Sequence, residues 1–202
     1  MTTSRRTFAV GIAAAAVLAG CDRIAGRNAV PTFHFTDITG AEFARKLDLP
    51  DVEGKPRSLA DWKGKVTVVF FGYTQCPDVC PTTMAELAQI RKLLGADGDK
   101  LQIVFVTIDP ERDTPEILKA YVANFGPGVV ALRGNAEQTA AAAKEFKVFY
   151  AKVPGKSPGS YTMDHSAASF VFDPAGRVRL FVPYASDPNI LATDLKQLVS
   201  AG

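Results

Sequence analysis

The sequence lacks an excess of charge of either sign. Its 202 residues include 23 Lys and Arg against 21 Asp and Glu. Two of the basic residues, Arg5 and Arg6, lie in an N-terminal segment that we expect to be removed, which leaves 21 charges of each sign. A neutral protein lacks the positive field with which proteins attract nucleic acids. We therefore expect no nucleic-acid partner.

The sequence also lacks an apolar run long enough for a permanent membrane helix at its N-terminus. The alanine-rich run 8–20 has 13 residues, whereas a spanning helix needs about 20. Since it follows two arginines, residues 1–20 are predicted to be a cleaved signal peptide. Leu18-Ala19-Gly20-Cys21 resembles the lipobox of bacterial lipoproteins, which predicts a lipid on Cys21 that tethers the protein to the extracytoplasmic face of the cell membrane. A plain cleaved signal with a free cysteine is one alternative, and a permanent membrane anchor is a weaker one. The loose resemblance of residues 4–8 to a twin-arginine signal leaves the export route open.

Cysteine and histidine are scarce, with three of the former and two of the latter. A mature chain of about 180 residues buries roughly 70% of the surface of its unfolded form, so the fold needs neither a disulfide scaffold nor a structural metal. The cysteines therefore require another explanation. With Cys21 assigned to lipid, Cys76 and Cys80 remain for chemistry, and the two histidines are His34 and His165.

Predicted strands and helices alternate along the rest of the chain. Residues 21–44 are assigned to a tether and lead-in, and residues 45–202 to one domain. The runs 66–73 and 101–108 are apolar on both faces, which is typical of adjacent central strands in a parallel sheet. The other expected elements are helices at 81–94, 114–125 and 135–146, a short strand at 147–153, an antiparallel hairpin of 168–172 and 177–182, and a last helix from 187. This order predicts an α/β fold, namely a thioredoxin-like mixed central sheet with helices on both faces.

Cys76 and Cys80 lie where the strand 66–73 ends and the next helix begins. The carboxyl end of a strand is where α/β proteins bind ligands, and the free N–H groups of a helix start favour thiolates. Because Pro81 disfavours helical geometry at the residue before it, both thiols are expected in a turn that precedes the helix. Their spacing suits a disulfide or two ligands of one metal ion, and an inert structural cystine is a third possibility. Three residues separate them, whereas thiol oxidoreductases on this scaffold normally have two.

His165 is the third candidate ligand. On a thioredoxin-like scaffold, the loop that contains it passes beside the helix start that bears the cysteines. Asp164 and Asp78 are candidates for orienting the ligands, although a solvated loop position explains them equally well. Met163 is expected in the core rather than as a thioether ligand, and His34 at the surface or partly packed.

Two thiolates and one imidazole form a soft, three-coordinate ligand set. Such a set suits Cu(I), and it accepts Cu(II) when an oxygen ligand or water joins. Structural zinc would want a fourth protein ligand, for which only Asp78 or Asp164 is available. Copper is therefore the predicted metal, bound by Cys76, Cys80 and His165.

Three separated segments resemble the SCO/SenC family of copper proteins. They are residues 70–81, with the sequence FFGYTQCPDVCP, residues 109–115, with DPERDTP, and residues 164–166, with DHS. The resemblance implies a membrane-anchored, thioredoxin-like protein that binds copper through the two cysteines and the histidine. It also implies a role in assembling the binuclear copper centre of cytochrome c oxidase, whose copper-bearing subunit would be the partner. The lipoprotein-type signal replaces the family's usual anchor helix.

Two classes of function remain open. The protein is either a copper chaperone rather than an enzyme, or a thiol-disulfide reductase that keeps the cysteines of the oxidase copper site reduced. Copper binding needs His165, whereas disulfide exchange needs only Cys76 and Cys80. A peroxide-reducing enzyme is less favoured, since nothing resembles a lone peroxidatic cysteine with an arginine partner. Residues 109–115 are expected to form a turn and a solvated helix start, with a docking surface as the alternative.

Overall fold

The computed structural model describes residues 32–201. Cys21 and the predicted signal peptide lie outside this range. Among the residues that are described, no helix combines the length and the apolar character needed to cross a membrane.

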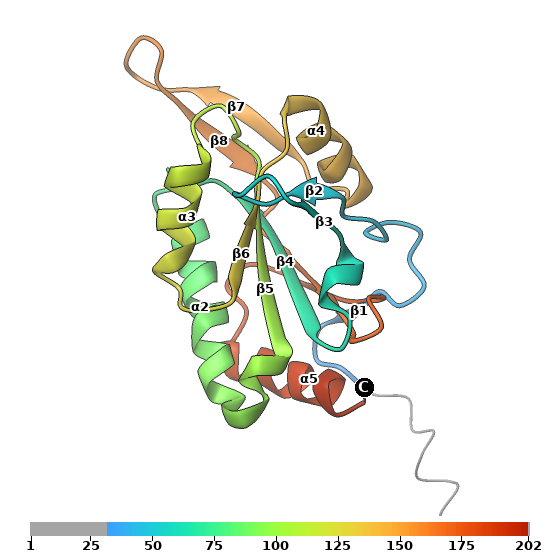
Figure 1. Ribbon diagram of the computed structural model, residues 1–202. Coiled ribbons are helices and arrows are strands. Elements are labelled where there is room, and N and C mark those ends of the chain that lie inside the picture. Colours follow the sequence, from blue (N-terminus) through green and yellow to red (C-terminus); the bar gives the residue numbers. More distant parts are fainter. Residues whose placement is uncertain (1–31, 202) are drawn as a thin grey trace, which may run out of the picture. The chain divides into compact units, whose positions relative to one another are not determined.

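A six-stranded mixed sheet runs through the described domain, in the order β1-β10-β9-β4-β5-β6 (Figure 1). At its centre, β4 (Val66–Gly72) and β5 (Leu101–Thr107) pair in parallel, and every residue of both is buried. Their side chains show no polar alternation because both faces of the sheet are covered. The prediction of two adjacent central strands is therefore confirmed.

The other elements follow the expected alternation of strands and helices. β6 (Val129–Leu132) extends the sheet in parallel beside β5, while β9 (Ser169–Phe172), β10 (Val178–Val182) and β1 (Thr36–Asp37) extend it antiparallel beside β4. The helices are α2 (Val79–Leu93), α3 (Pro115–Ala123), α4 (Ala136–Glu145) and α5 (Pro188–Ser200), with 3-10 turns at Leu59–Trp62 and Gly95–Lys100. Two smaller hairpins pair β2 (Leu49–Pro50) with β3 (Pro56–Arg57), and β7 (Tyr150–Pro154) with β8 (Tyr161–His165).

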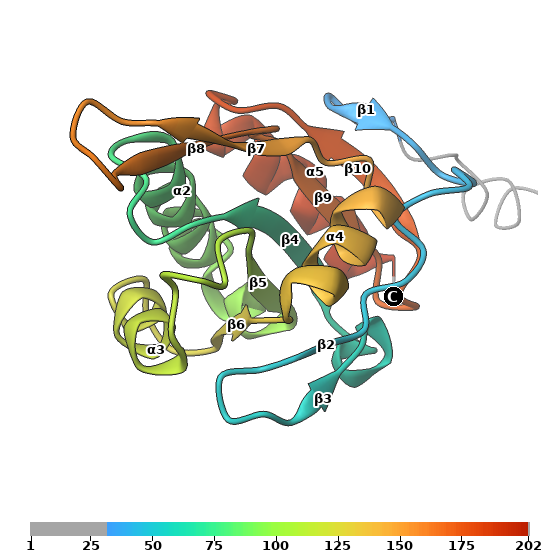
Figure 2. The ribbon, with the colours of Figure 1, turned by 90° about the horizontal axis from the view of Figure 1, so that it is seen from above.

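Helices cover both faces of the sheet (Figure 2). On one face, Tyr121 of α3 packs on Phe105 of β5, with ring centroids 5.3 Å apart. On the other face, Phe146 at the end of α4 packs on Phe71 and Phe170, at 5.0 and 5.2 Å. The thioredoxin-like, mixed α/β layout predicted from the sequence is thus confirmed.

Residues 33–44, which the sequence pattern assigns to a lead-in, pack against this domain. β1 pairs with β10, and the fully buried carboxylate of Asp194 in α5 accepts hydrogen bonds from the main-chain N–H groups of His34 and Phe35. The same carboxylate lies 2.8 Å from Nδ1 of His34, whose side chain is half exposed. His34 is therefore partly packed, as expected. Polar contacts thus act together with the partial packing of Phe33 and Phe35 against the core, and apolar periodicity does not reveal either kind of contact.

Candidate metal centre

The two cysteines sit on either side of a helix start. Cys76 lies in the loop after β4, but α2 already begins at Val79, so the expectation that both thiols precede the helix is wrong for Cys80. Pro81 is the third residue of this helix. The N–H group that proline lacks has no partner within the first turn of any helix, so proline is tolerated there. Cys80 is the second residue of the helix, so its main-chain N–H also has no partner within the helix. It donates instead to Sγ of Cys76, 3.4 Å away.

His165 reaches the cysteines from the β7–β8 hairpin. The sequence predicts a strand near β7 but a loop in place of β8, whose last residue is His165. Nδ1 of this histidine lies 3.0 Å from the main-chain oxygen of Ser166, and Nε2 lies 3.5 Å from Sγ of Cys80. When Nδ1 donates its proton to that oxygen, the lone pair of Nε2 is available to a metal ion.

Two aromatic rings hold the imidazole of His165. The ring centroids of Phe70 and Tyr73 lie 6.2 and 6.0 Å from that of the imidazole, both in an edge-on arrangement. Both side chains are buried, because they belong to β4 and to the residue just after it. The third candidate ligand is therefore packed against the same strand end that leads to the cysteines.

The donor atoms of Cys76, Cys80 and His165 lie within 4.8 Å of one another. Two ligands that each form a bond of about 2.3 Å to one ion are at most about 4.6 Å apart, so only a slight closure would place all three around one metal ion. Cys80 is fully buried, whereas the other two are partly exposed and line an open cavity of about 310 Å³. Met163 beside this cavity is buried, in agreement with its expected place in the core. The structure thus brings together the three residues singled out in the sequence.

The two thiols differ in acidity. Hydrogen bonds from the Cys80 thiol and from the main-chain N–H groups of Asp78 and Cys80 lower the pKa of Cys76 to about 5, although partial burial opposes them. The hydrogen bond to Cys76, together with burial, raises the pKa of Cys80. At neutral pH the pair therefore holds one negative charge and one proton. A metal ion bound by both sulfurs would displace that proton.

The two aspartates proposed to orient the ligands both line the cavity. Asp78 donates to Cys76 through its main-chain N–H, while its carboxylate accepts a hydrogen bond from the hydroxyl of Thr82. The oxygen beside Nδ1 of His165 belongs to the main chain of Ser166. The main chain thus supplies the contact expected of the Asp164 carboxylate.

Gly72, the last residue of β4, is a site residue that sequence reasoning missed. A Cβ atom at this position would lie 2.8 Å from Sγ of Cys80 and 3.0 Å from ring carbons of Phe70 and Phe105. The missing side chain therefore leaves the space that the Cys80 sulfur fills. One signal was available, because a glycine inside a buried strand of bulky residues often marks a close approach by another group.

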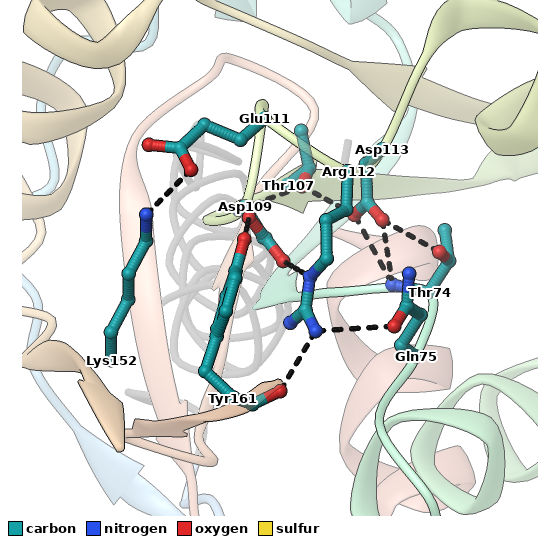
Figure 3. Close-up of polar contacts among 9 residues, drawn as sticks. All are labelled: Thr74, Gln75, Thr107, Asp109, Glu111, Arg112, Asp113, Lys152 and Tyr161. Atoms are coloured by element: carbon teal, nitrogen blue, oxygen red, sulfur yellow. Dashed lines mark hydrogen bonds and ion pairs between the residues drawn. The ribbon is translucent and has the colours of Figure 1, made fainter. Parts of the chain in front are cut away.

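The loop that follows β5 has the turn and the Thr114 helix cap that the sequence predicts for residues 109–115, but its charges are not all solvated. Asp109 and Asp113 are almost fully buried. The hydroxyls of Thr74 and Thr107 each donate to the Asp113 carboxylate at 2.6 Å, and the main-chain N–H of Thr74 donates as well (Figure 3). A buried carboxylate requires such donors. The loop is therefore bound to the segment that leads into Cys76.

The comparisons with known proteins agree with this geometry. The SCO1/SenC family model matches residues 32–200. An SCO2-like protein of Rickettsia felis is 35% identical over 151 residues, which cover 74% of each chain. The chain aligns with only 44% to 54% of the length of mitochondrial relatives.

Solved structures extend the comparison to the fold. ScoI of Bradyrhizobium japonicum with copper bound is 40% identical, with a TM-score of 0.66, over 76% of this chain and 97% of that one. BsSco, a member of the Sco family of cytochrome c oxidase assembly proteins in which a disulfide switch has been identified, is 23% identical with a TM-score of 0.62. That alignment covers 82% of this chain and 97% of BsSco, and it shows a shared fold.

Proposed function

The chain belongs to the SCO1/SenC family, and we propose that it is a copper chaperone that delivers copper to the binuclear copper centre of cytochrome c oxidase. The observation that carries the proposal is the convergence of Cys76, Cys80 and His165, whose donor atoms lie within 4.8 Å of one another. The copper bound by the Bradyrhizobium relative supports the choice of metal. The role of Sco proteins in oxidase assembly supports the choice of recipient.

Copper is the cargo in this proposal, and the donor set fits it. Two sulfurs and an imidazole nitrogen suit Cu(I), which accepts low coordination numbers. Cys76 is already a thiolate at neutral pH, and Cys80 gives up its proton when the metal binds. Because Cys76 and His165 are partly exposed, ligands of a partner can approach from that side. The oxidase subunit that carries the copper centre is the proposed partner.

We place the protein at the extracytoplasmic face of the cell membrane, held by a lipid on Cys21. Roughly ten residues separate this cysteine from the first described residues, and a fully extended chain of that length spans at most about 35 Å. Such a short tether would keep the metal centre near a membrane-embedded oxidase. Cell fractionation tests this point, since Cys21→Ser should release the protein from membranes, and retention of the variant would contradict it.

A thiol-disulfide reductase is the second candidate, and the unequal acidity of the two thiols favours it. The Cys76 thiolate would attack a disulfide of the oxidase copper site and form a mixed disulfide, releasing one partner thiolate. Cys80, after losing its proton, would then attack Cys76. This step forms the Cys76–Cys80 disulfide and releases the second partner thiol, so two electrons pass to the partner.

One mixing experiment separates the two candidates. The reduced protein is loaded with one equivalent of Cu(I) and mixed anaerobically with the copper-free, reduced copper-bearing domain of the oxidase. The chaperone proposal predicts that the oxidase domain holds copper after the two proteins are separated. In a parallel arm, the metal-free reduced protein is mixed with the same domain in its disulfide form. Reduction of that disulfide without copper transfer in the first arm would favour the reductase.

A further inference from the structure

Arg112 lies between the two elements that carry the proposed ligands, although it does not belong to the ligand set. It is part of the loop between β5 and α3, and its side chain is 20% exposed. Nη1 donates to Oε1 of Gln75 at 3.1 Å and to the main-chain oxygen of Tyr161 at 2.8 Å (Figure 3). Gln75 directly precedes Cys76, and Tyr161 begins the strand that ends at His165. One guanidinium group therefore contacts both ligand-bearing segments.

Ring contacts reinforce this bridge. The guanidinium carbon lies 3.6 Å from the centroid of the Tyr161 ring and 5.7 Å from that of Tyr73. A cation over an aromatic face is attracted by the negative face of the ring. Tyr73 in turn packs edge-on against the imidazole of His165. Arg112 is thus linked to the histidine through Tyr161 in the same strand and through Tyr73 beside it.

The carboxylate of Asp109 fixes the position of the bridge. Its Oδ2 accepts a hydrogen bond from Nε of Arg112 at 2.5 Å, and its Oδ1 accepts one from the hydroxyl of Tyr161 at 2.9 Å. This aspartate is only 1% exposed, so water does not compete for these bonds. Asp113, in the same loop, accepts hydrogen bonds from the main-chain N–H and the hydroxyl of Thr74. The arginine is held on several sides.

The β7–β8 hairpin is attached to the rest of the domain by side-chain contacts, with Met163 in the core and His165 against Phe70 and Tyr73. Within the described residues, β7 and β8 pair with each other and form no strand pairing with the six-stranded sheet. The hairpin and the loop share one further tie, an ion pair of Lys152 and Glu111, but both of these side chains are well exposed. Exposed ion pairs contribute little to stability. The partly buried contacts of Arg112 with Tyr161 and Asp109 are the stronger of these two connections.

We propose that Arg112 is a positioning residue that sets the separation between the imidazole of His165 and the sulfurs of Cys76 and Cys80. The inference rests on the proposed function, because this separation matters only if the three donors share one ion. The cysteines are placed by the junction of β4 and α2, whereas the histidine depends on how the hairpin sits against that junction. Arg112 joins the two parts and leaves the donor atoms free.

The test compares Arg112→Gln with the unaltered protein and with His165→Ala. Copper affinity of Arg112→Gln, measured by competition with a chromophoric Cu(I) chelator, should fall about 10- to 100-fold, as is typical when a residue that orients ligands is lost. The Cu(II) form of Arg112→Gln should resemble the Cu(II) form of His165→Ala. In both variants the paramagnetic resonance spectrum should lose the nitrogen coupling of the histidine, while the thiolate-to-copper absorption band persists.

Arg57→Gln provides a matched control. Arg57 is 26% exposed and binds the 4% exposed Asp51 at 2.7 Å, and both belong to the β2–β3 hairpin, which carries no proposed ligand. Its removal breaks a comparable buried pair, yet the copper affinity and both spectra should match those of the unaltered protein. If Arg57→Gln weakens copper binding equally, the effect reflects general destabilisation and the inference is wrong.

The remaining outcomes are also decisive. If the unaltered protein binds no copper, the proposed function fails whatever Arg112 does. If it binds copper and Arg112→Gln shows the same affinity and the same nitrogen coupling, the inference about Arg112 is overturned. Should circular dichroism show that Arg112→Gln does not fold, Arg112→Lys takes its place. A lysine keeps the charge but cannot form the same set of directed bonds, so unaltered copper affinity and nitrogen coupling in that variant would contradict the proposal.

Discussion

In the β9–β10 turn and in the loop between β5 and α3, a buried aspartate binds an arginine of the same segment. The Nε···Oδ2 distance is 2.9 Å for Arg177 and Asp173, and 2.5 Å for Arg112 and Asp109. The other bonds of the two carboxylates differ. Asp173 accepts from main-chain N–H groups within its own turn. Asp109 accepts instead from the hydroxyl of Tyr161, 52 residues further along the chain.

The aspartate–arginine pair therefore has a different structural role in each of the two regions. In the β9–β10 turn it fixes local geometry, so its loss should reduce stability alone. Near the metal centre it joins segments that are distant in sequence, so its loss should change the placement of the ligands. The two regions can be separated by variants that affect copper binding, stability or both.

Removing a ligand should give the largest effect at the metal centre. In Cys80→Ser, a soft thiolate is replaced by a hydroxyl, which is a poor ligand for Cu(I). Copper affinity should fall by more than the roughly 100-fold upper range for residues that only orient ligands. Competition with a chromophoric Cu(I) chelator under anaerobic conditions measures the loss. An affinity within tenfold of the unaltered protein would show that Cys80 is not a ligand.

Gly72→Ala should affect both copper binding and stability. The added methyl group would lie 2.8 Å from Sγ of Cys80, so the sulfur must move. Overpacking of this kind lowers the free energy of unfolding by roughly 1–3 kcal/mol, and we expect weaker copper binding as well. Gly64→Ala is the control, because nothing lies within 4 Å of its Cβ position and its φ of +87° makes alanine strained there. That variant should lose stability in denaturant unfolding yet bind copper normally, and normal copper binding by Gly72→Ala would contradict the account.

A change in the β9–β10 turn should affect stability only. Asp173→Asn removes the charge that the main-chain N–H groups and Arg177 stabilise. Asn keeps an acceptor oxygen for the main-chain N–H groups but loses the oxygen that accepts from Arg177, so denaturant unfolding should show a loss of up to about 1.5–3 kcal/mol, the contribution of one hydrogen bond to a charged group. Copper affinity should not change. A parallel fall in copper affinity would mean that the turn and the metal centre are not independent.

Much of this arrangement could be predicted from the sequence because it depends on local patterns and chain order. The apolar runs of β4 and β5 identify the central strands, and Asn135 and Thr114 cap helices where expected. The meeting of Cys76, Cys80 and His165 follows from the order of elements in a thioredoxin-like fold. Each of these inferences uses neighbouring residues or topology alone.

The remaining features depend on contacts between distant segments. The helix begins before Cys80 because proline is tolerated in a first turn, and a rule about the preceding residue alone misses this. The role of Gly72 depends on a sulfur from α2, and the burial of Asp109 depends on Tyr161 in another hairpin. The spacing of residues within the loop after β5 predicts solvated charges, because it contains no information about Tyr161 or Thr74. These partners of the buried Asp109 and Asp113 are brought to the loop only in the folded chain.

A change of pH, which alters no residue, should have the smallest effect on the metal centre, through the titration of Cys76. Because the pKa of Cys76 is lowered to about 5, it lies below the value of about 8.5 for an unfolded thiol. The contribution of the Cys76 thiolate to the free energy of unfolding is therefore complete above about pH 8.5, and it is lost progressively as the pH falls towards 5. Thiolate absorbance at about 240 nm in the reduced, metal-free protein should show one group titrating near pH 5. A single midpoint near 8.5 would contradict the proposed hydrogen bonds to Cys76.

In the proposed copper site, His165 completes the ligand set of the two cysteines. The variant His165→Ala tests this role when copper competition and a disulfide-reduction assay are run on the same preparation. Copper affinity should fall steeply while dithiol reducing activity survives, because disulfide exchange needs only the two thiols. An unchanged copper affinity would show that His165 is not a ligand, and the reductase would then be the better description of the protein.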